Sequence, residues 1–197
     1  GGVGGGGYGE GMTSLLLGPD SRARCAWVGD DAEYRRYHDE EWGTPLHGDR
    51  ALFEKMALEG FQAGLSWITI LRKRDNFRAA FANFDPEIVA RFGEEDRARL
   101  MADAGIIRSN GKIDAAIAGA RIYLDMQERG EDFSTFLWDM VGGAPIQNNF
   151  TAMSEVPAQT PLAAEMAKAL KARISKGKGI WRLLWGWCIK AGCPVLA

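Results

Sequence analysis

The spacing of hydrophobic residues along the chain is typical of a helical protein. From Asp30 onward, apolar residues recur every three or four positions, and no stretch alternates apolar and polar residues over the length of a strand. We therefore predict an all-α fold of roughly six to eight helices with no internal repeat. The predicted helices span residues 31–40, 50–72, 86–92, 94–104, 111–129, 132–141, 161–174 and 180–191, with irregular loops at 43–49 and 142–160.

Residues typical of helix ends stand close to these boundaries. An Asp or Thr just before a helix accepts a hydrogen bond from the first N–H groups, and proline suits the first helical position because its missing N–H would be unpaired there. Glycine favours the left-handed conformation in which many helices end. The expected starts are Asp30 with Glu33 as a capping box, Asp85 before Pro86 and Thr160 before Pro161, and the expected stops are Gly105 and Gly130.

Composition defines the class of protein without indicating an activity. The 197 residues are 46% hydrophobic and 25% charged, which is ordinary for a soluble globular protein. Residues 1–20 open with a glycine-rich run that cannot bury apolar surface, so we expect a disordered leader followed by a single domain over residues 21–197.

No apolar run reaches the roughly 20 residues of a membrane span, and no secretory signal is recognisable. We expect a cytoplasmic monomer. Its net charge of −2 means that a nucleic-acid ligand would need a local basic surface.

The first candidate site is the aromatic segment CAWVGDDAEYRRYHDEEW, residues 25–42. A helix over 31–40 places Tyr34, Tyr37 and His38 on one face, with one tryptophan before the helix and one after it. One interpretation is a hydrophobic face whose tyrosine hydroxyls reach water. The other is a stacking site for a planar ligand, and four large aromatic side chains around one histidine favour it. These four are Trp27, Tyr34, Tyr37 and Trp42.

The second candidate is Glu59, which falls on the apolar stripe of the predicted helix 50–72. Its spacing from Leu52 places the carboxylate among core positions, where a charge is costly unless it has a partner. A structural ion pair would explain it. Nearby Gly60 and Gly64 leave room beside the helix, and Trp67 follows, so a ligand slot containing an acid and an aromatic ring is the alternative.

The third candidate is the segment DAGIIRSNGKI, residues 103–113, between two predicted helices. Its two glycines allow a tight turn that exposes N–H groups at a helix N-terminus, where phosphate binds readily. A plain corner between helices is the alternative. A phosphate-binding hairpin would hold DNA by its backbone without reading sequence. The candidate DNA-backbone residues are Gly105, Arg108, Gly111 and Lys112.

Taken together, these motifs resemble a known protein family. The segments CAWV, YHDEEWG, LFEKMALEGFQAGLSWITILRKR, FDP, DAGIIRSNGKI and FLW have the order and spacing of the bacterial DNA-3-methyladenine glycosylase I family, within the helix-hairpin-helix glycosylase superfamily. The resemblance covers about Arg24 to about Arg173, and the tail 174–197 departs from the family pattern. It implies an all-helical, two-lobed fold around a central base-binding pocket. It also implies an enzyme that extrudes N3-methyladenine from alkylated double-stranded DNA and hydrolyses its N-glycosidic bond.

The resemblance also assigns roles to individual residues. It places Glu59, the candidate catalytic residue, at the polar edge of the methylated base, with Trp67 and Tyr37 as stacking walls. N3-methyladenine is cationic and a good leaving group, so an aromatic cage, cation–π attraction and an oriented water suffice for the reaction. The remaining base-binding candidates are Trp27, Tyr34 and Trp42.

A structural zinc ion is implied as well, with Cys25 and His38 as its first two ligands. Structural zinc usually has four protein ligands, and the second pair is not recognisable in this tail. Besides His38 the chain has only one histidine, His47. Cys188 and Cys193 would either complete a Cys3His set or remain free thiols. We expect zinc to be bound substoichiometrically or not at all.

Two other classes of function stay open at this point. One is a catalytically weak protein of the same shape that binds damaged DNA. The other is a helical interaction protein whose aromatic groove takes a peptide or a nucleotide. Release of free 3-methyladenine would distinguish the glycosylase from both, and salt-sensitive duplex binding would separate these two alternatives.

Overall fold

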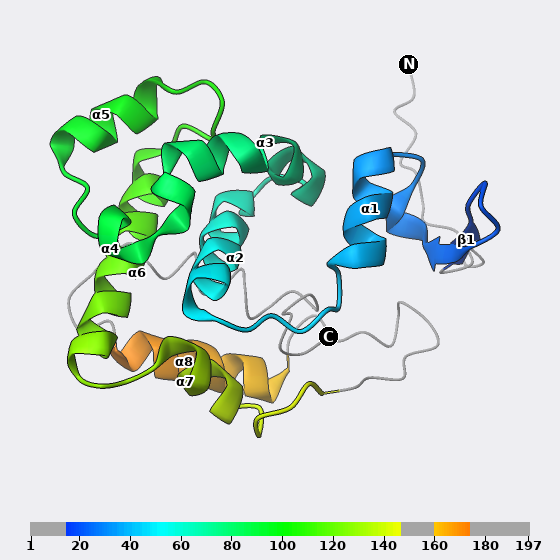
Figure 1. Ribbon diagram of the computed structural model, residues 1–197. Coiled ribbons are helices and arrows are strands. Elements are labelled where there is room, and N and C mark those ends of the chain that lie inside the picture. Colours follow the sequence, from blue (N-terminus) through cyan, green and yellow to red (C-terminus); the bar gives the residue numbers. More distant parts are fainter. Residues whose placement is uncertain (1–14, 147–159, 174–197) are drawn as a thin grey trace, which may run out of the picture.

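The protein is built mainly from helices, as predicted (Figure 1). The computed structural model describes residues 15–146 and 160–173, and the predicted helix 180–191 lies outside them. The elements are β1 (Leu15–Leu17), β2 (Ala23–Cys25), η1 (Ala26–Val28), α1 (Ala32–Glu40), α2 (Asp49–Gln62), α3 (Trp67–Ala80), η2 (Ala82–Phe84), α4 (Pro86–Val89), α5 (Glu94–Ala102), α6 (Asn110–Glu128), α7 (Phe133–Asp139) and α8 (Pro161–Arg173).

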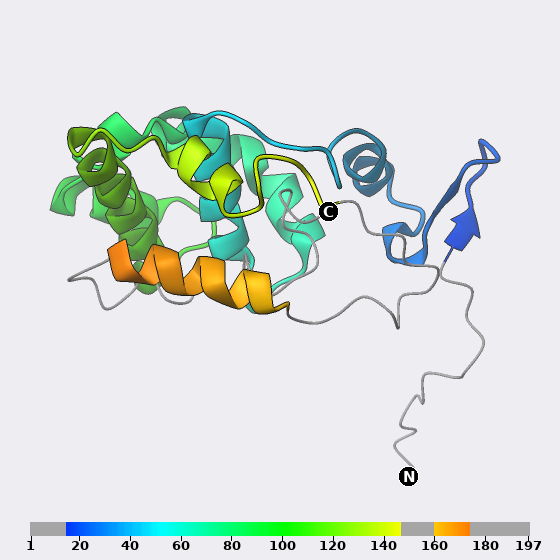
Figure 2. The ribbon, with the colours of Figure 1, turned by 90° about the horizontal axis from the view of Figure 1, so that it is seen from below.

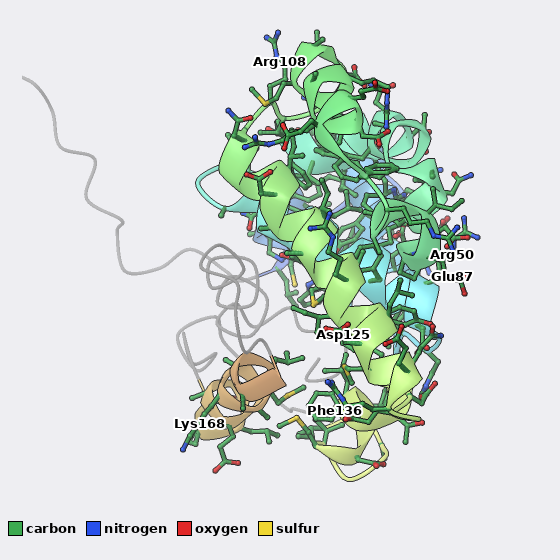
Figure 3. The ribbon with its side chains drawn as sticks, turned by 90° about the vertical axis from the view of Figure 1, so that its left-hand side faces the viewer. Arg50, Glu87, Arg108, Asp125, Phe136 and Lys168 are labelled. Carbon is green, nitrogen blue, oxygen red and sulfur yellow. The ribbon has the colours of Figure 1, made fainter. Side chains whose placement is uncertain are left out.

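The core lies where α2, α3, α4 and α6 meet. Four phenylalanines pack against one another in its centre, and each fully buried ring stabilises the fold by roughly 1.5–3 kcal/mol relative to an exposed one. They are Phe61, Phe77, Phe81 and Phe84, all fully buried. Helix α6 runs the length of this body, from Arg108 just before its start to α7 beyond its end (Figure 3). Helix α8 lies at the same end of the molecule as α7 (Figure 1), runs along one face of the helical body (Figure 2) and buries Met166.

The predicted helix 50–72 is wrong as a single element, because the chain breaks between α2 and α3. Gly64 has φ of +81°, a left-handed conformation that side chains disfavour and that interrupts the helix. The Gln62 side chain closes the turn by donating from Nε2 to the Leu65 carbonyl at 2.6 Å. This turn lets α3 start at Trp67, beside α2 rather than in line with it.

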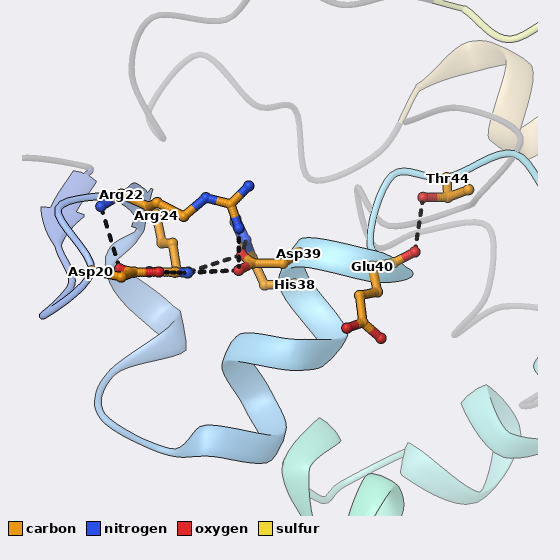
Figure 4. A network of polar contacts seen from close by, with 7 residues as sticks. All are labelled: Asp20, Arg22, Arg24, His38, Asp39, Glu40 and Thr44. Atoms are coloured by element: carbon orange, nitrogen blue, oxygen red, sulfur yellow. Dashed lines mark hydrogen bonds and ion pairs between the residues drawn. The ribbon is translucent and has the colours of Figure 1, made fainter.

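Residues 15–20 were expected to lie outside the fold, and this expectation is wrong. Strands β1 and β2 form a two-stranded antiparallel hairpin, a pairing that the search for alternating patterns missed because each strand is only three residues long. The Arg24 guanidinium is almost fully buried between the carboxylates of Asp20 and Asp39, and binds both with two hydrogen bonds or more (Figure 4). Residues 1–14 of the predicted leader lie outside the described residues.

The helix boundaries agree with most of the predicted capping residues. Asp31, one residue after the predicted Asp30, caps α1 by accepting from the Tyr34 N–H at 2.9 Å. Asp85 caps α4 and the Thr160 hydroxyl caps α8, both as predicted. Gly130 ends α6 with φ of +73°.

Helix α1 and the β hairpin stand at one side of the helical body (Figure 1). Two arginines of α3 attach α1 to the helical body. Arg74 binds the Glu41 carboxylate through both terminal nitrogens, at 2.6 and 2.9 Å, and Arg72 binds the Asp31 carboxylate. Among the described residues, no helix is long and apolar enough to cross a membrane.

Candidate functional site

Six aromatic side chains form a row in which each ring contacts the next, referred to below as the aromatic row. Helix α1 contributes three of them, and the others come from η1, from the residues after α1 and from the start of α3. In order along the row they are Trp42, His38, Trp27, Tyr34, Tyr37 and Trp67, with successive centroid separations of 5.3, 5.4, 4.9, 6.5 and 5.6 Å.

The end of the row at Tyr37 and Trp67 carries the charged groups. Glu59 is mostly buried, with 14% of its side chain exposed, and its Oε1 lies 3.0 Å from the Lys55 ammonium one helical turn earlier. Lys55 also donates to the Tyr37 hydroxyl at 3.1 Å and lies 4.1 Å from the Trp67 ring centroid. The carboxylate on the core stripe therefore has an ion-pair partner and adjoins the two predicted stacking walls at the same time.

The helix break at Gly64 is what creates this arrangement. Because the chain turns at Gly64, Trp67 at the start of α3 faces the same region as Glu59 on α2. The turn is fixed from outside by Lys112 on α6, whose ammonium donates to the carbonyls of Phe61 and Ala63 at 2.9 and 2.7 Å. Lysine near a helix C-terminus satisfies carbonyls that have no partner within the helix.

Two buried ring nitrogens in the row have no hydrogen-bond partner among the described residues. They are Nε1 of Trp67 and Nε2 of His38. A buried polar group without a partner costs roughly 1–3 kcal/mol, so native proteins rarely keep one without a reason. Each nitrogen therefore marks a place where an external group could bind. At Trp67 this group would accept a hydrogen bond from Nε1, and at His38 it would bind the lone pair of Nε2.

Trp27 and Trp42 occupy the other end of the row, where both pack on His38. Trp42 stacks on the imidazole with an interplanar angle of 15°, and Trp27 meets it at 57°. Their predicted contact with a base stays a prediction, because the contacts described here serve to position His38. Tyr34 lies between the two ends and contacts both Trp27 and Tyr37.

His38 is oriented by its neighbour Asp39. Its Nδ1 lies 3.1 Å from the Asp39 carboxylate, which can only accept, so Nδ1 carries the hydrogen and Nε2 of the neutral ring keeps a free lone pair. This is the arrangement found at metal-binding histidines. Cys25 is a partly buried free thiol, and burial raises the pKa of this thiol. No cluster of three metal-binding side chains occurs within residues 15–146 and 160–173, and Cys188 and Cys193 lie outside that part of the chain.

The hairpin between α5 and α6 contains glycines of two different kinds. Gly105 is closely packed, because a Cβ there would lie 2.9 Å from the Asp103 carboxylate and 3.1 Å from the Asn76 amide, and these side chains would have to move. Its carbonyl also accepts from the side chains of Lys73 and Asn76 on α3. At Gly111 a Cβ would contact nothing within 4 Å, and φ is not positive. Nothing within the described protein therefore demands glycine at 111.

Two basic residues of the hairpin also differ in their surroundings. Arg108 is exposed and extends from the end of the molecule into solvent (Figure 3). Lys112 is half-buried and donates to the α2 carbonyls, and burial lowers the pKa of its ammonium. A phosphate contact by Lys112 stays a prediction, whereas its structural role is evident from these contacts.

The sequence interpretation missed Lys55. A signal for it was present, because Lys55 and Glu59 are four residues apart on one helix and therefore share a face. An aromatic row that ends at a carboxylate, with an unpaired indole N–H beside it, has the chemistry to bind a flat ligand that carries positive charge or donates hydrogen bonds.

Comparisons with known proteins identify the family of the chain. The family model for methyladenine glycosylase matches residues 27–179. The chain is 51% identical over 150 residues to DNA-3-methyladenine glycosylase 1 of Escherichia coli K12, covering 76% of this chain and 80% of that protein. It is similar to a crystal structure of a 3-methyladenine DNA glycosylase I, with a TM-score of 0.77, 44% identity, and coverage of 88% of this chain and 93% of that one.

A third comparison concerns a ligand complex. A crystal structure of the Tyr-to-Phe variant of a 3-methyladenine DNA glycosylase I, in complex with 3-methyladenine, is 34% identical and has a TM-score of 0.76. It covers 87% of this chain and 91% of that one. Our protein belongs to the methyladenine glycosylase family.

Proposed function

We propose that this protein is a DNA glycosylase that flips N3-methyladenine out of alkylated DNA and hydrolyses its bond to deoxyribose. The observation that carries the proposal is the meeting of Glu59, Tyr37 and Trp67 at the end of the aromatic row. These side chains come from three separate helices, so only the folded chain brings them together. Family membership and the relative crystallised with 3-methyladenine support the same substrate.

The chemistry needs little from the protein beyond binding and orientation. N3-methyladenine in DNA is cationic, so when the bond from C1′ to the base breaks, the electron pair goes to the base and cancels its charge. Water then adds its hydroxyl to C1′ and releases a proton, which leaves an abasic sugar. Glu59 accepts hydrogen bonds from the base, and the rings of Tyr37 and Trp67 stack on it and stabilise its charge.

Release of free base from methylated duplex DNA, measured by chromatography, tests this function. We expect the wild-type chain to release 3-methyladenine and Glu59→Gln to release it roughly ten- to hundredfold more slowly, because a hydrogen bond to a charged group is lost. Glu54→Gln is the matched control, since Glu54 lies on the same helix but pairs with Arg78. This pair is partly buried and includes no residue of the aromatic row, so the activity of the variant should stay near wild type. Binding to methylated duplex without release would instead identify a damage-binding protein.

We further propose that the turn between α5 and α6 is a helix-hairpin-helix element that holds the DNA backbone. The exposed Gly111 at the start of α6 supports it, since no contact within the described protein requires glycine there. Ser109, the residue before α6, makes no side-chain capping bond, which leaves the first N–H groups of α6 available to a phosphate. Arg108 would add positive charge beside it.

A metal ion near the aromatic row is a further proposal, with His38 and Cys25 as two of its ligands. The buried Nε2 of His38 and its orienting contact with Asp39 support the fit. A zinc ion there would act as a structural link between the β hairpin and α1. Its remaining ligands would have to come from residues outside those described, where Cys188 and Cys193 are the candidates.

A further inference from the structure

Lys55 contacts all three groups that are assigned to the methylated base. Its ammonium pairs with Glu59 at 3.0 Å, donates to the Tyr37 hydroxyl at 3.1 Å and lies 4.1 Å from the centre of the Trp67 ring. It also lies 5.3 Å from the centre of the Tyr37 ring. A base that hydrogen bonds to Glu59 and stacks on both rings must use the same contacts, so the ammonium and the base compete for them.

The ammonium is a strong occupant of this position. Only 15% of the Lys55 side chain is exposed, and while burial alone would lower its pKa, the Glu59 carboxylate and Tyr37 outweigh that effect and raise it. Lys55 is therefore charged at neutral pH. A charged group over an aromatic face and largely shielded from water is held more firmly than an exposed one.

The two rings are also too close together to receive a base as they stand. Tyr37 and Trp67 have centroids 5.6 Å apart and planes inclined by 52°. A flat base stacked between two rings needs roughly 7 Å between them, twice the optimal contact distance of about 3.5 Å, and nearly parallel planes. Base entry must therefore move at least one ring, and the ammonium that bridges Tyr37, Trp67 and Glu59 resists this movement.

We propose that Lys55 is an internal cationic occupant of the base site, which holds the site closed in the free protein and is displaced when a base enters. The inference rests on the proposed function, because it assumes that the base binds at Glu59, Tyr37 and Trp67. Lys55 must give up the same contacts with Glu59, Tyr37 and Trp67 whichever base enters. It therefore weakens the binding of every base by a similar factor. In DNA, the positive charge of the N3-methylated base compensates Glu59 once the ammonium has moved, whereas an undamaged base leaves that carboxylate without a charged partner.

Titration of free 3-methyladenine into the full chain tests the displacement, with calorimetry as the readout. Lys55→Met keeps a long side chain but removes the charge, so we expect about tenfold tighter binding than wild type, equivalent to about 1.4 kcal/mol. Lys168→Met, at an exposed lysine on α8 (Figure 3), is the control and should bind as wild type does. Equal or weaker binding by Lys55→Met would mean that Lys55 does not oppose the base, and the proposal would be wrong.

A second measurement uses the unaltered chain and does not depend on the folding of a variant. Lysine acetylation with a water-soluble reagent, followed by peptide mass spectrometry, reports how accessible each ammonium is. Saturating 3-methyladenine should raise the acetylation rate of Lys55 severalfold, while the exposed Lys168 stays constant. A rate at Lys55 that falls or does not change would contradict displacement.

The two proposals fail in different ways. If neither wild type nor Lys55→Met binds 3-methyladenine, the proposed function is wrong and the inference falls with it. If wild type binds the base, Glu59→Gln weakens that binding, and Lys55→Met is no tighter than wild type, the function stands and only the role of Lys55 is overturned.

Discussion

At the scale of single residues, Glu59 combines a structural ion pair with the position that the proposed base contact requires. Glu59 was expected either to form a structural ion pair or to bind a ligand. In the structure it does the first through Lys55, and it stands beside the aromatic rings that the second requires. An ion pair that is mostly buried needs both partners, because removal of one leaves an uncompensated charge. A cationic ligand is the natural replacement for the lysine.

Asp31 connects two parts of the molecule and provides a test of pH dependence. Its carboxylate accepts from the Tyr34 N–H and from Arg72 on α3, and these contacts lower its pKa. A carboxyl with a lowered pKa in the folded protein contributes stability above its ordinary pKa of about 3.8, and this contribution is lost as the pH falls further. We expect Asp31→Asn to be less stable than wild type at neutral pH, with a difference that closes below about pH 3.8.

Denaturant unfolding at a series of pH values measures this difference. Asparagine retains an oxygen that can cap α1, so the variant tests the charge rather than the cap. Asp125→Asn, at an exposed position on α6 (Figure 3), serves as the control and should track wild type at every pH. A gap between Asp31→Asn and wild type that persisted at low pH would contradict the role of the charge.

At the scale of elements, the turn between α5 and α6 offers a test in which one substitution should raise stability and lower DNA affinity. Gly111 lies in the first turn of α6 with open space where a Cβ would be. Replacing a helical glycine with alanine normally stabilises a helix by about 0.5–1 kcal/mol. If α6 meets a phosphate here, the same change places a methyl group between the N–H groups and the DNA.

We therefore expect Gly111→Ala to raise the free energy of unfolding by about 0.5–1 kcal/mol and yet to weaken duplex binding. Gly111→Asp should weaken it more, because the added negative charge suits a helix N-terminus but repels phosphate. The loss should be similar for unrelated DNA sequences. Thermal unfolding and fluorescence anisotropy at low salt measure the two effects, and unchanged affinity in both variants would identify a plain corner between helices.

Helix α2 shows how one element depends on others for its function. Its C-terminal carbonyls are bound by Lys112 from α6, and the turn that follows places Trp67 next to Glu59. Lys112, which was predicted to hold DNA, thus also supports the turn that positions Trp67. A change at Lys112 would therefore affect both regions, which makes it a poor probe of DNA contact compared with the exposed Arg108.

At the scale of the whole molecule, the site lies where α1 meets the helical body. Arg72 and Arg74 of α3 hold α1 in place, and Tyr37 of α1 reaches Lys55 on α2. A metal ion at His38 and Cys25 would fix α1 from its other side, toward the β hairpin. Whether the chain can complete such a site depends on its C-terminal cysteines.

We expect the purified protein to contain less than one zinc per chain, because the sequence provides no recognisable second pair of ligands. Elemental analysis of wild type, His38→Ala and Cys188→Ser measures the metal directly. Any zinc present should be lost in His38→Ala. One tightly bound zinc per chain that disappears on Cys188→Ser or Cys193→Ser would show instead that the tail completes the site.

The sequence alone determined the helical class, most helix boundaries and the unusual residues of the site. Periodicity reports which face of a helix is buried, so a carboxylate at Glu59 could be recognised as misplaced, and capping at Asp85 and Thr160 follows from local hydrogen bonding. These are properties of a few neighbouring residues, which is why they are visible without a structure. The break at Gly64 was also local, but the apolar pattern continues through it and concealed it.

Only the tertiary structure decided which partners those residues have. Lys55 meets Tyr37 and Trp67 because α3 packs against both α1 and α2, and no spacing in the sequence encodes that contact. Likewise, Lys112 binds the end of α2 rather than solvent because α6 crosses it there. Burial follows from a pattern along one helix, whereas an ion pair or a ring contact depends on how helices distant in sequence are oriented, and that is set by the packing of the whole core.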